Sequence, residues 1–155
     1  MQLQFEYLVD YPDSVPQVIA WWQSVWADRM GSDLEKATDQ LRLSLSRDEL
    51  PVHILALLNG KAVSVAALKL QELAELFPDK QYWLGSVFVD EDYRNDKIGS
   101  AITVNIVELA QAMGLPHLYL QTMNLSGGLY AKLGWEHVLQ FNYKGEETLL
   151  MINQL

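Results

Sequence analysis

Apolar and polar residues alternate along the chain with two different periods, and these periods predict four helices and seven strands. In the helical segments, apolar side chains recur at steps of three and four residues, which places them on one face. The segment Ser32-Asp-Leu-Glu35 also has the form of a capping box at a helix start. The predicted helices cover residues 12–30, 32–50, 98–113 and 126–133, and each is ended by a Gly or a Pro.

The predicted strands are shorter runs rich in apolar, β-branched and aromatic residues. Asn59-Gly60 joins two of them, which is a strong short-range signal for a hairpin, and Lys144-Gly145 marks a second hairpin. The strands cover residues 3–9, 52–58, 62–70, 82–89, 117–122, 135–143 and 146–152. The order βααβββαβαββ predicts a single α+β domain over residues 1–155, built on a mixed sheet.

The charge and the residue composition of the chain exclude some classes of function. The chain of 155 residues has 11 Lys and Arg against 20 Asp and Glu, a formal net charge of −9. Clustered basic residues are what nucleic-acid binding needs, so we expect no nucleic-acid partner, whereas a cationic small molecule is compatible. The absence of cysteine excludes a disulfide scaffold and a Cys nucleophile. Without a signal peptide or a long apolar run, we expect a cytoplasmic protein with no membrane partner.

Chemistry is concentrated where a buried strand runs into a polar turn and then a helix. The segment Val87-Phe-Val-Asp-Glu-Asp-Tyr-Arg94-Asn-Asp-Lys97-Ile-Gly99-Ser100 offers free amides at a helix start, a glycine that admits a close ligand, and two cations. These features predict a phosphate or pyrophosphate site. A helix with a glycine near its start and solvated charges has the same pattern, so the motif alone is not specific.

Two motifs in sequence order resemble those of the GNAT superfamily of N-acetyltransferases. Arg94-x-x-Lys97-Ile98-Gly99-Ser100 is similar to the family's acyl-CoA-binding motif, and Leu129-Tyr130-Ala-Lys132-Leu-Gly134-Trp135 is similar to its second signature. The resemblance covers essentially the whole chain. It implies a GNAT-like mixed, mostly antiparallel central sheet flanked by helices, and acetyl-CoA-dependent acetylation of a primary amine of a small molecule or peptide. The alternative is a CoA-binding or regulatory module of this fold without turnover.

The resemblance also implies roles for particular residues. Tyr130 stands where the family has the acid that protonates the leaving thiolate, although a core tyrosine also fits there. Since the chain has no cysteine, the acetyl group is expected to pass directly to the amine in a ternary complex. The residues expected to contact acetyl-CoA are Val87, Phe88, Val89, Arg94, Asn95, Lys97, Ile98, Gly99, Ser100 and Asn124.

Two positions depart from the family pattern. Lys97 occupies the slot of the family's first glycine. A left-handed backbone there costs a lysine of order 1 kcal/mol, whereas a helical backbone would let the side chain add a phosphate contact. The family's Asn, seven residues before the Tyr, is Met123 here, so the neighbouring Asn124 either takes its role after a local shift or is a turn residue.

The acceptor side and the general base are not singled out by the sequence. Gly85 marks either a bulge that re-aims backbone groups or packing beneath an aromatic ring. Acidic residues near the strand 82–89 are Glu72, Glu75 and Asp79, which also fit solvated loop charges. Further candidates for the acceptor side are Tyr82, Trp83 and Ser86.

Helical phase and spacing give simpler interpretations to other conspicuous residues. We predict that Trp22, Trp26, Met113 and Met123 are core residues, with Trp21 at the margin of the first helix face. No pair of histidines has metal-ligand spacing, so no metal is expected at His53, His117 or His137. The oligomeric state, monomer or homodimer, and the identity of the acceptor stay open.

Overall fold

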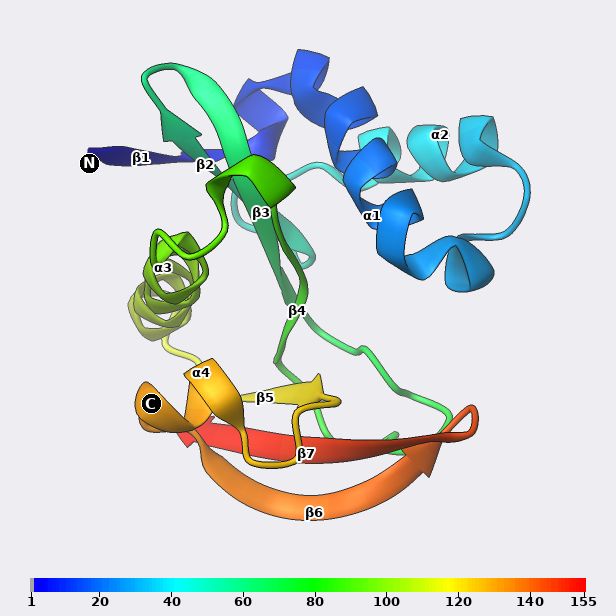
Figure 1. Cartoon of the computed structure of the whole chain (residues 1–155), viewed down its shortest axis with the longest axis vertical. Coiled ribbons are helices and arrows are strands. Elements are labelled where there is room, and N and C mark those ends of the chain that lie inside the picture. The colour runs from blue at the N-terminus through cyan, green and yellow to red at the C-terminus, as the bar shows by residue number, and fades with distance from the viewer. Residues whose placement is uncertain (1) are drawn as a thin grey trace.

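A seven-stranded sheet with the strand order β1-β2-β3-β4-β5-β7-β6 forms the centre of the protein (Figure 1). The structure is a computed structural model and describes residues 2–155. Every neighbouring pair of strands is antiparallel except β4 and β5, which are parallel. The strands are β1 (Leu3–Tyr7), β2 (Val52–Leu58), β3 (Lys61–Lys69), β4 (Trp83–Val89), β5 (His117–Thr122), β6 (Glu136–Tyr143) and β7 (Glu146–Gln154).

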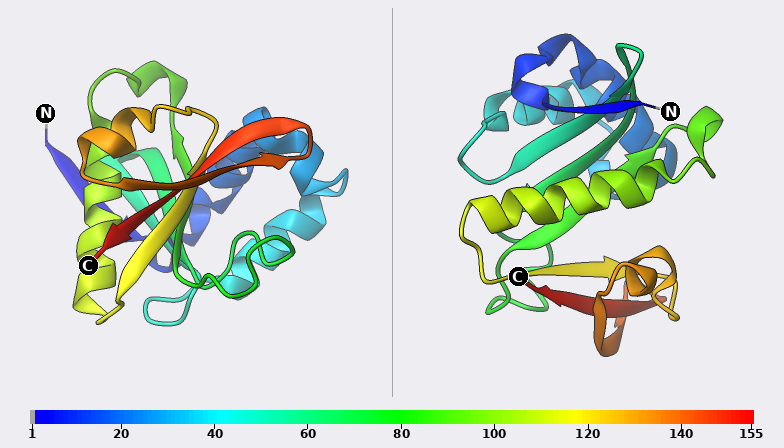
Figure 2. Two further views of the ribbon diagram at one scale, coloured as in Figure 1. Left: turned by 90° about the horizontal axis from the view of Figure 1, so that it is seen from below. Right: turned by 90° about the vertical axis from the view of Figure 1, so that its left-hand side faces the viewer.

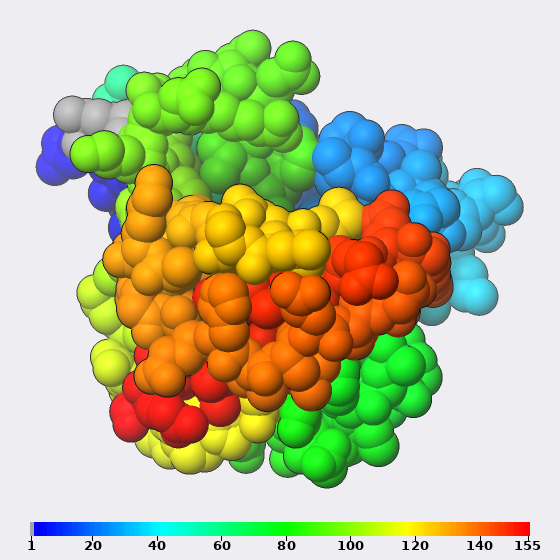
Figure 3. All heavy atoms as spheres, turned by 60° about the horizontal axis from the view of Figure 1, so that its bottom comes forward, coloured from blue at the N-terminus to red at the C-terminus, as the bar shows by residue number. Residues whose placement is uncertain are grey.

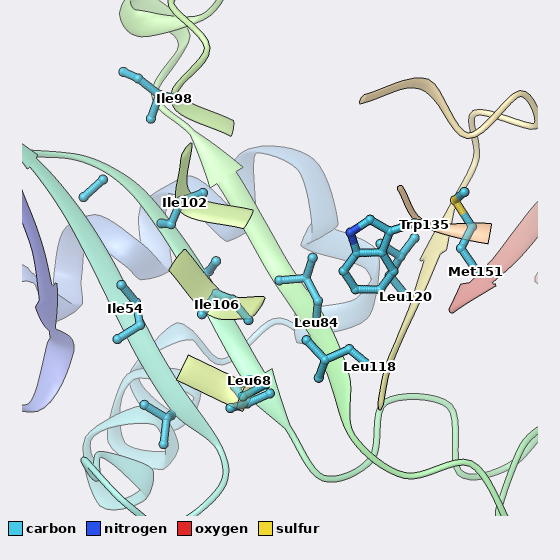
Figure 4. Close-up of a cluster of buried hydrophobic side chains, with 14 of the residues drawn as sticks. Ile54, Leu68, Leu84, Ile98, Ile102, Ile106, Leu118, Leu120, Trp135 and Met151 are labelled. Carbon is cyan, nitrogen blue, oxygen red and sulfur yellow. The ribbon is translucent and has the colours of Figure 1, made fainter. Parts of the chain in front are cut away.

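Helices cover both faces of the sheet (Figure 2). One face packs against α3, whose buried stripe of Ile98, Ile102 and Ile106 meets Leu84 of β4 (Figure 4). The other face packs against α1 and α2, and the β6–β7 hairpin, orange and red in Figure 3, forms the far end of the sheet. The helices are α1 (Val15–Met30), α2 (Leu34–Ser44), α3 (Ile98–Ala112) and α4 (Gly128–Lys132), with short 3-10 turns at η1 (Leu8–Asp10), η2 (Pro12–Ser14) and η3 (Glu91–Tyr93).

The predicted order of elements and the mixed, mostly antiparallel sheet are confirmed, with differences at several ends. The first strand ends at Tyr7 and the helix expected from Pro12 begins at Val15, because 3-10 turns occupy the residues between. Asp33 and not Ser32 caps α2, since its carboxylate accepts the Lys36 amide at 3.0 Å.

The second helix also stops earlier than expected, at Ser44 and not at Pro51. The Ser44 hydroxyl donates to the Leu41 carbonyl at 2.8 Å, and Leu45 is already extended. A local side-chain bond of this kind competes with the helical ladder. The Ser46 hydroxyl then accepts the backbone amides of Asp48 and Glu49, so the following residues form a turn.

The prediction of core positions was wrong for four residues. Trp21 is buried, with its ring stacked on Phe88 at a centroid distance of 5.7 Å, whereas Trp22 and Trp26 are half-buried. The sheet beneath this part of α1 is where β4 and β5 separate, so the two rings border a cavity in place of a packed layer. Met123, beyond the end of β5, is 62% exposed, while Met113 packs against the core as expected.

Among residues 2–155, no helix combines the length and the apolar character that crossing a membrane requires.

Candidate active site

β4 and β5 pair at one end and then diverge. Trp83 is in register with Tyr119, and the Tyr119 amide donates to the Tyr82 carbonyl at 2.8 Å. No further register pair joins these two strands in the described chain, so the rest of β4 presents an open edge toward β5. Ligands bind in the crevice outside the carboxyl ends of parallel strands, and an extended ligand can pair with a free strand edge. The divergence therefore leaves a strand edge with backbone groups free for an extended ligand.

A β-bulge reshapes β4 at this edge. Val65 pairs with Phe88 and Ala67 with Gly85, so two residues of β4, Ser86 and Val87, lie opposite a single residue of β3. Ser86 has a left-handed backbone, with φ 54°. The bulge expected from Gly85 is thus present just after it. The indole of Trp22 on α1 donates to the Ser86 carbonyl at 3.2 Å, which fixes α1 over the bulge.

A cavity of about 540 Å³ opens beside the bulge, a size suited to a small molecule. It receives side chains from α1 and α4, from the loop after β3, and from strands β3 to β7. The lining residues that carry hydrogen-bonding side chains are Trp22, Trp26, Arg29, Lys69, Glu72, Ser86, Gln121, Thr122, Tyr130, Tyr143 and Thr148.

Glu72 and Tyr130, distant in the sequence, line this one cavity. The Glu72 side chain is only 14% exposed, and its Oε1 lies 3.3 Å from Lys69 Nζ. Of the three acidic candidates, Glu72 is therefore held at the cavity. Glu75 and Asp79 are exposed and do not line it, so the interpretation as solvated loop charges fits these two.

The Tyr130 phenol is protonated at neutral pH. Burial raises the pKa of this phenol above its ordinary value, and the negative charge of Glu72 raises it further. Among residues 2–155 its hydroxyl has no hydrogen-bond partner, while its ring packs edge-on against Trp135 at a centroid distance of 6.2 Å. The ring thus anchors the side chain in the core and leaves the hydroxyl available.

The start of α3 carries the features of an anion site. Lys97 caps the helix with a left-handed backbone, φ 62° and ψ 19°, so the left-handed alternative is the one observed. The first helical amide bond runs from Ala101 to the Lys97 carbonyl, which leaves the amides of Ile98, Gly99 and Ser100 outside the helical ladder. These amides and the helix dipole favour a phosphate group.

Side chains around this helix start differ in what they can offer a ligand. Lys97, Asn95 and Arg94 are exposed, but the Arg94 Nε donates to the Val89 carbonyl at 3.1 Å and its guanidinium lies over Phe88. A β-carbon on Gly99 would lie at ordinary contact distance, 3.5 Å, from Leu129 Cδ2.

Three of the residues expected to contact CoA have side chains that are engaged in the fold. Two of these side chains are buried, and the third forms a turn. The side chains of Phe88 and Ile98 are buried in the core, so only their backbone groups are available to a ligand. Of the two alternatives for Asn124, the structure shows the turn residue. Its Oδ1 accepts hydrogen bonds from the Ser126 amide at 3.2 Å and from the Ser126 hydroxyl at 2.7 Å. This turn leads from β5 into α4 and so orients Tyr130.

The sequence did not point to Arg29, Lys69 and Tyr143 as cavity residues. Arg29 and Lys69 belong to α1 and β3, and the aromatic Tyr143 to β6, so no local motif contains them. The positions of Trp22 and Trp26, one helical turn apart, were the available signal, and it was interpreted as packing. No cluster of three or more His, Asp or Glu side chains able to hold a metal ion occurs in the described residues.

Comparisons with known proteins bear on the fold and the family. No relative was found among curated proteins. Solved structures match over almost the whole chain at low identity: a GNAT-family acetyltransferase from Streptococcus pneumoniae has a TM-score of 0.71 at 21% identity, covering 99% of each chain.

Two further structures match equally well. A ribosomal-protein-alanine N-acetyltransferase from Brucella melitensis has a TM-score of 0.74 at 17% identity and covers 100% of each chain. An aminoglycoside 6'-N-acetyltransferase in complex with coenzyme A has a TM-score of 0.73 at 14% identity, covering 99% of this chain and 97% of that one. At such identities the likeness shows the fold.

The family model of the acetyltransferase (GNAT) family matches residues 16–135, which include the open edge of β4, the start of α3 and Tyr130. The protein therefore belongs to the acetyltransferase (GNAT) family.

Proposed function

We propose that the protein is an acetyl-CoA-dependent N-acetyltransferase that transfers the acetyl group directly to a primary amine. One observation carries the proposal: a partly buried carboxylate, Glu72, and a protonated phenol, Tyr130, line the same cavity beside the open edge of β4. A base for the amine and an acid for the thiolate are the two proton-transfer groups that this reaction uses.

In this proposal, Glu72 accepts the proton that the attacking amine must lose. The amine nitrogen forms a bond to the thioester carbonyl carbon, and the carbon–sulfur bond then breaks. Tyr130 donates its proton to the departing thiolate. Lys69 holds the carboxylate of Glu72 in place through Oε1. Backbone amides on the open edge of β4, next to the bulge at Ser86, are candidates to stabilise the oxyanion that develops in between.

The cosubstrate is proposed to lie along the open edge of β4 and to end at α3. Val87 and Val89 supply backbone groups for the pantetheine arm, and the amides of Ile98, Gly99 and Ser100 receive the pyrophosphate. A related fold was solved in complex with coenzyme A, which supports a CoA thioester as the cosubstrate. The proposal treats the whole chain as one domain that works in the cytoplasm, where acetyl-CoA is available.

A second candidate is a module that binds CoA without turnover. Lys97 in a strained left-handed position and the use of Asn124 in a turn favour it, because both depart from the family's binding pattern. The two candidates differ in what they require of Tyr130 and Glu72: turnover depends on both side chains, whereas CoA binding alone depends on neither.

The test measures thiol release from acetyl-CoA with a panel of primary amines, and CoA binding by thermal shift, in the same samples. We expect turnover that falls about 10²-fold in Tyr130→Phe and in Glu72→Gln, with the CoA-induced shift kept. Matched controls are Tyr119→Phe and Asp79→Asn, whose side chains lie outside the cavity. A CoA-induced shift without turnover on any amine would establish the binding module, and no shift at millimolar CoA would reject both candidates.

A further inference from the structure

The charge of the cavity is opposite to that of the chain. The whole chain carries a net charge of −9. The charged side chains that line the cavity, however, are Arg29, Lys69 and Glu72, two cations and one carboxylate. Charges beyond the cavity act on a bound ligand through solvent and are screened within about 8 Å at physiological ionic strength. The lining, more than the net charge, therefore decides which acceptor fits.

Lys69 and Glu72 neutralise each other within this lining. Their ion pair is 3.3 Å long, and the two side chains are only 24% and 14% exposed. The other ion pair within residues 2–155, Arg47 with Asp10, lies outside the cavity. Arg29 is thus the one charged group of the lining that has no ion-pair partner among the described residues.

Arg29 is positioned by an aromatic ring. It lies in the last turn of α1, and its guanidinium carbon is 5.2 Å from the centre of the Tyr143 ring. The Tyr143 hydroxyl in turn lies 3.5 Å from Glu75 Oε1, so the ring is fixed at its other end. A guanidinium stacked on an aromatic face keeps its N–H groups available at its edge, where they can bind a carboxylate bidentately.

The neighbouring hollow provides no further carboxylate. This hollow, of about 430 Å³, shares Trp22, Lys69 and Ser86 with the cavity. The ionisable groups among its lining residues are the Lys69 ammonium and the imidazole of His53. Burial lowers the pKa of that imidazole to about 4, so it is neutral at pH 7. A polyamine that extended from the cavity into this hollow would place its second cation near Lys69 and meet no carboxylate there.

We propose that the acceptor is an amine that also carries a carboxylate, as an amino acid does, and that Arg29 binds this carboxylate. The inference rests on the proposed function and names the substrate class of the same cavity. The amine end lies toward Glu72 and the acidic end toward Arg29. It replaces the cationic acceptor that the net charge of the chain suggested, because that charge is not carried by the cavity.

The test compares matched amines with the CoA-bound protein. Each of glycine, β-alanine and γ-aminobutyrate is offered beside its carboxamide, and spermidine is added as a polycation. Two quantities are measured: kcat/KM from thiol release, and equilibrium binding by calorimetry. We expect at least one carboxylate member to exceed its carboxamide by about tenfold or more in both quantities, the range of a charge-assisted hydrogen-bonded pair, and to exceed spermidine.

Arg29→Gln is expected to reduce the ratio of carboxylate to carboxamide to below about threefold, and Arg29→Lys to restore part of it. The matched control is Arg47→Gln, an arginine that also lies over a tyrosine, Tyr7, but is not part of the lining; it should keep the wild-type ratio. A wild-type preference for carboxamides or spermidine, equal or undetectable binding of the carboxylates, or an unchanged ratio in Arg29→Gln overturns the inference. Preferential carboxylate binding without product rejects the proposed function but supports the role of Arg29.

Discussion

The carboxylate of Glu72 occupies the space that a side chain on Gly85 would fill. A β-carbon built on Gly85 would lie 2.2 Å from Glu72 Oε1, closer than real contacts allow, and 3.0 Å from its Cδ. The glycine therefore lets the loop after β3 press a carboxylate against β4, immediately before the bulge at Ser86. The packing alternative for Gly85 thus holds as well as the bulge, but the group above it is a carboxylate and not an aromatic ring.

Replacing this glycine tests whether the position of Glu72 matters. Gly85→Ala should push the carboxylate out of its place and lower turnover by about 10-fold to 10²-fold, close to the loss in Glu72→Gln. The double variant should lose little more than either single one, since both remove the same group. Steady-state kinetics measures the three losses, and the CoA-induced thermal shift serves as the control for folding. If Gly85→Ala keeps full turnover while Glu72→Gln has lost it, Glu72 does not need this position.

The pH dependence of turnover tests the coupling between Glu72 and Tyr130. The raised pKa of the phenol keeps it protonated, so the loss of kcat/KM at high pH should begin above pH 10, the ordinary pKa of a tyrosine. Burial is the larger cause and the charge of Glu72 the second. Glu72→Gln removes that negative charge, which lowers the pKa of Tyr130.

The high-pH limb of the residual activity in Glu72→Gln should accordingly shift to lower pH. Asp79→Asn, which changes an exposed carboxylate outside the cavity, should leave the limb in place. A limb that is the same in all three proteins would show that the titrating group is not Tyr130.

Local signals in the sequence were sufficient for the order of the elements. Asn59-Gly60 set the β2–β3 hairpin, and Gly134 ended the short helix close to where α4 stops. Helical phase located the sheet-facing side of α1 but not what lies beneath it, which is why Trp22 and Trp26 were assigned to the core. The cavity itself depends on the divergence of β4 and β5, a tertiary feature, so Arg29 and Lys69 could not be grouped with Glu72 and Tyr130 beforehand.

The left-handed Lys97 predicts a stability gain from glycine. Its φ of 62° costs a residue with a β-carbon about 1 kcal/mol, and glycine avoids that cost. Lys97→Gly should therefore have a free energy of unfolding about 1 kcal/mol above that of Lys97→Ala, measured by urea denaturation. Because the Lys97 side chain offers at most one exposed charge contact, both variants should weaken CoA binding by less than about tenfold.

Lys144, at the tip of the β6–β7 hairpin, has a similar backbone, with φ 52°, and provides the matched control. Lys144→Gly should show the same gain over Lys144→Ala with no change in CoA affinity. A loss of CoA binding in Lys97→Ala larger than that in Gly99→Val would instead make Lys97 a principal phosphate ligand.

His53 predicts a loss of stability in mild acid. The side chain is 5% exposed, and its Nδ1 has no hydrogen-bond partner among the described residues. Burial first, and the charge of Lys69 second, lower its pKa from 6.5 to about 4. Below pH 6.5 the unfolded chain takes up a proton at this residue, while the folded protein does so only near pH 4. The free energy of unfolding should therefore fall between these two values, by about 3 kcal/mol in total from this group.

Urea denaturation at intervals from pH 7.5 to pH 4 measures this loss. His53→Gln, which cannot titrate, should show a shallower fall in the free energy of unfolding over that interval, by about 3 kcal/mol at its acid end. His137→Gln changes an exposed histidine and should follow the wild-type curve. Parallel curves for wild type and His53→Gln would mean that the folded protein admits the proton at His53 near pH 6.5. The His53 imidazole would then be positively charged in the hollow below pH 6.5. The argument against a polyamine acceptor uses a neutral imidazole, so this part of it would apply only above pH 6.5.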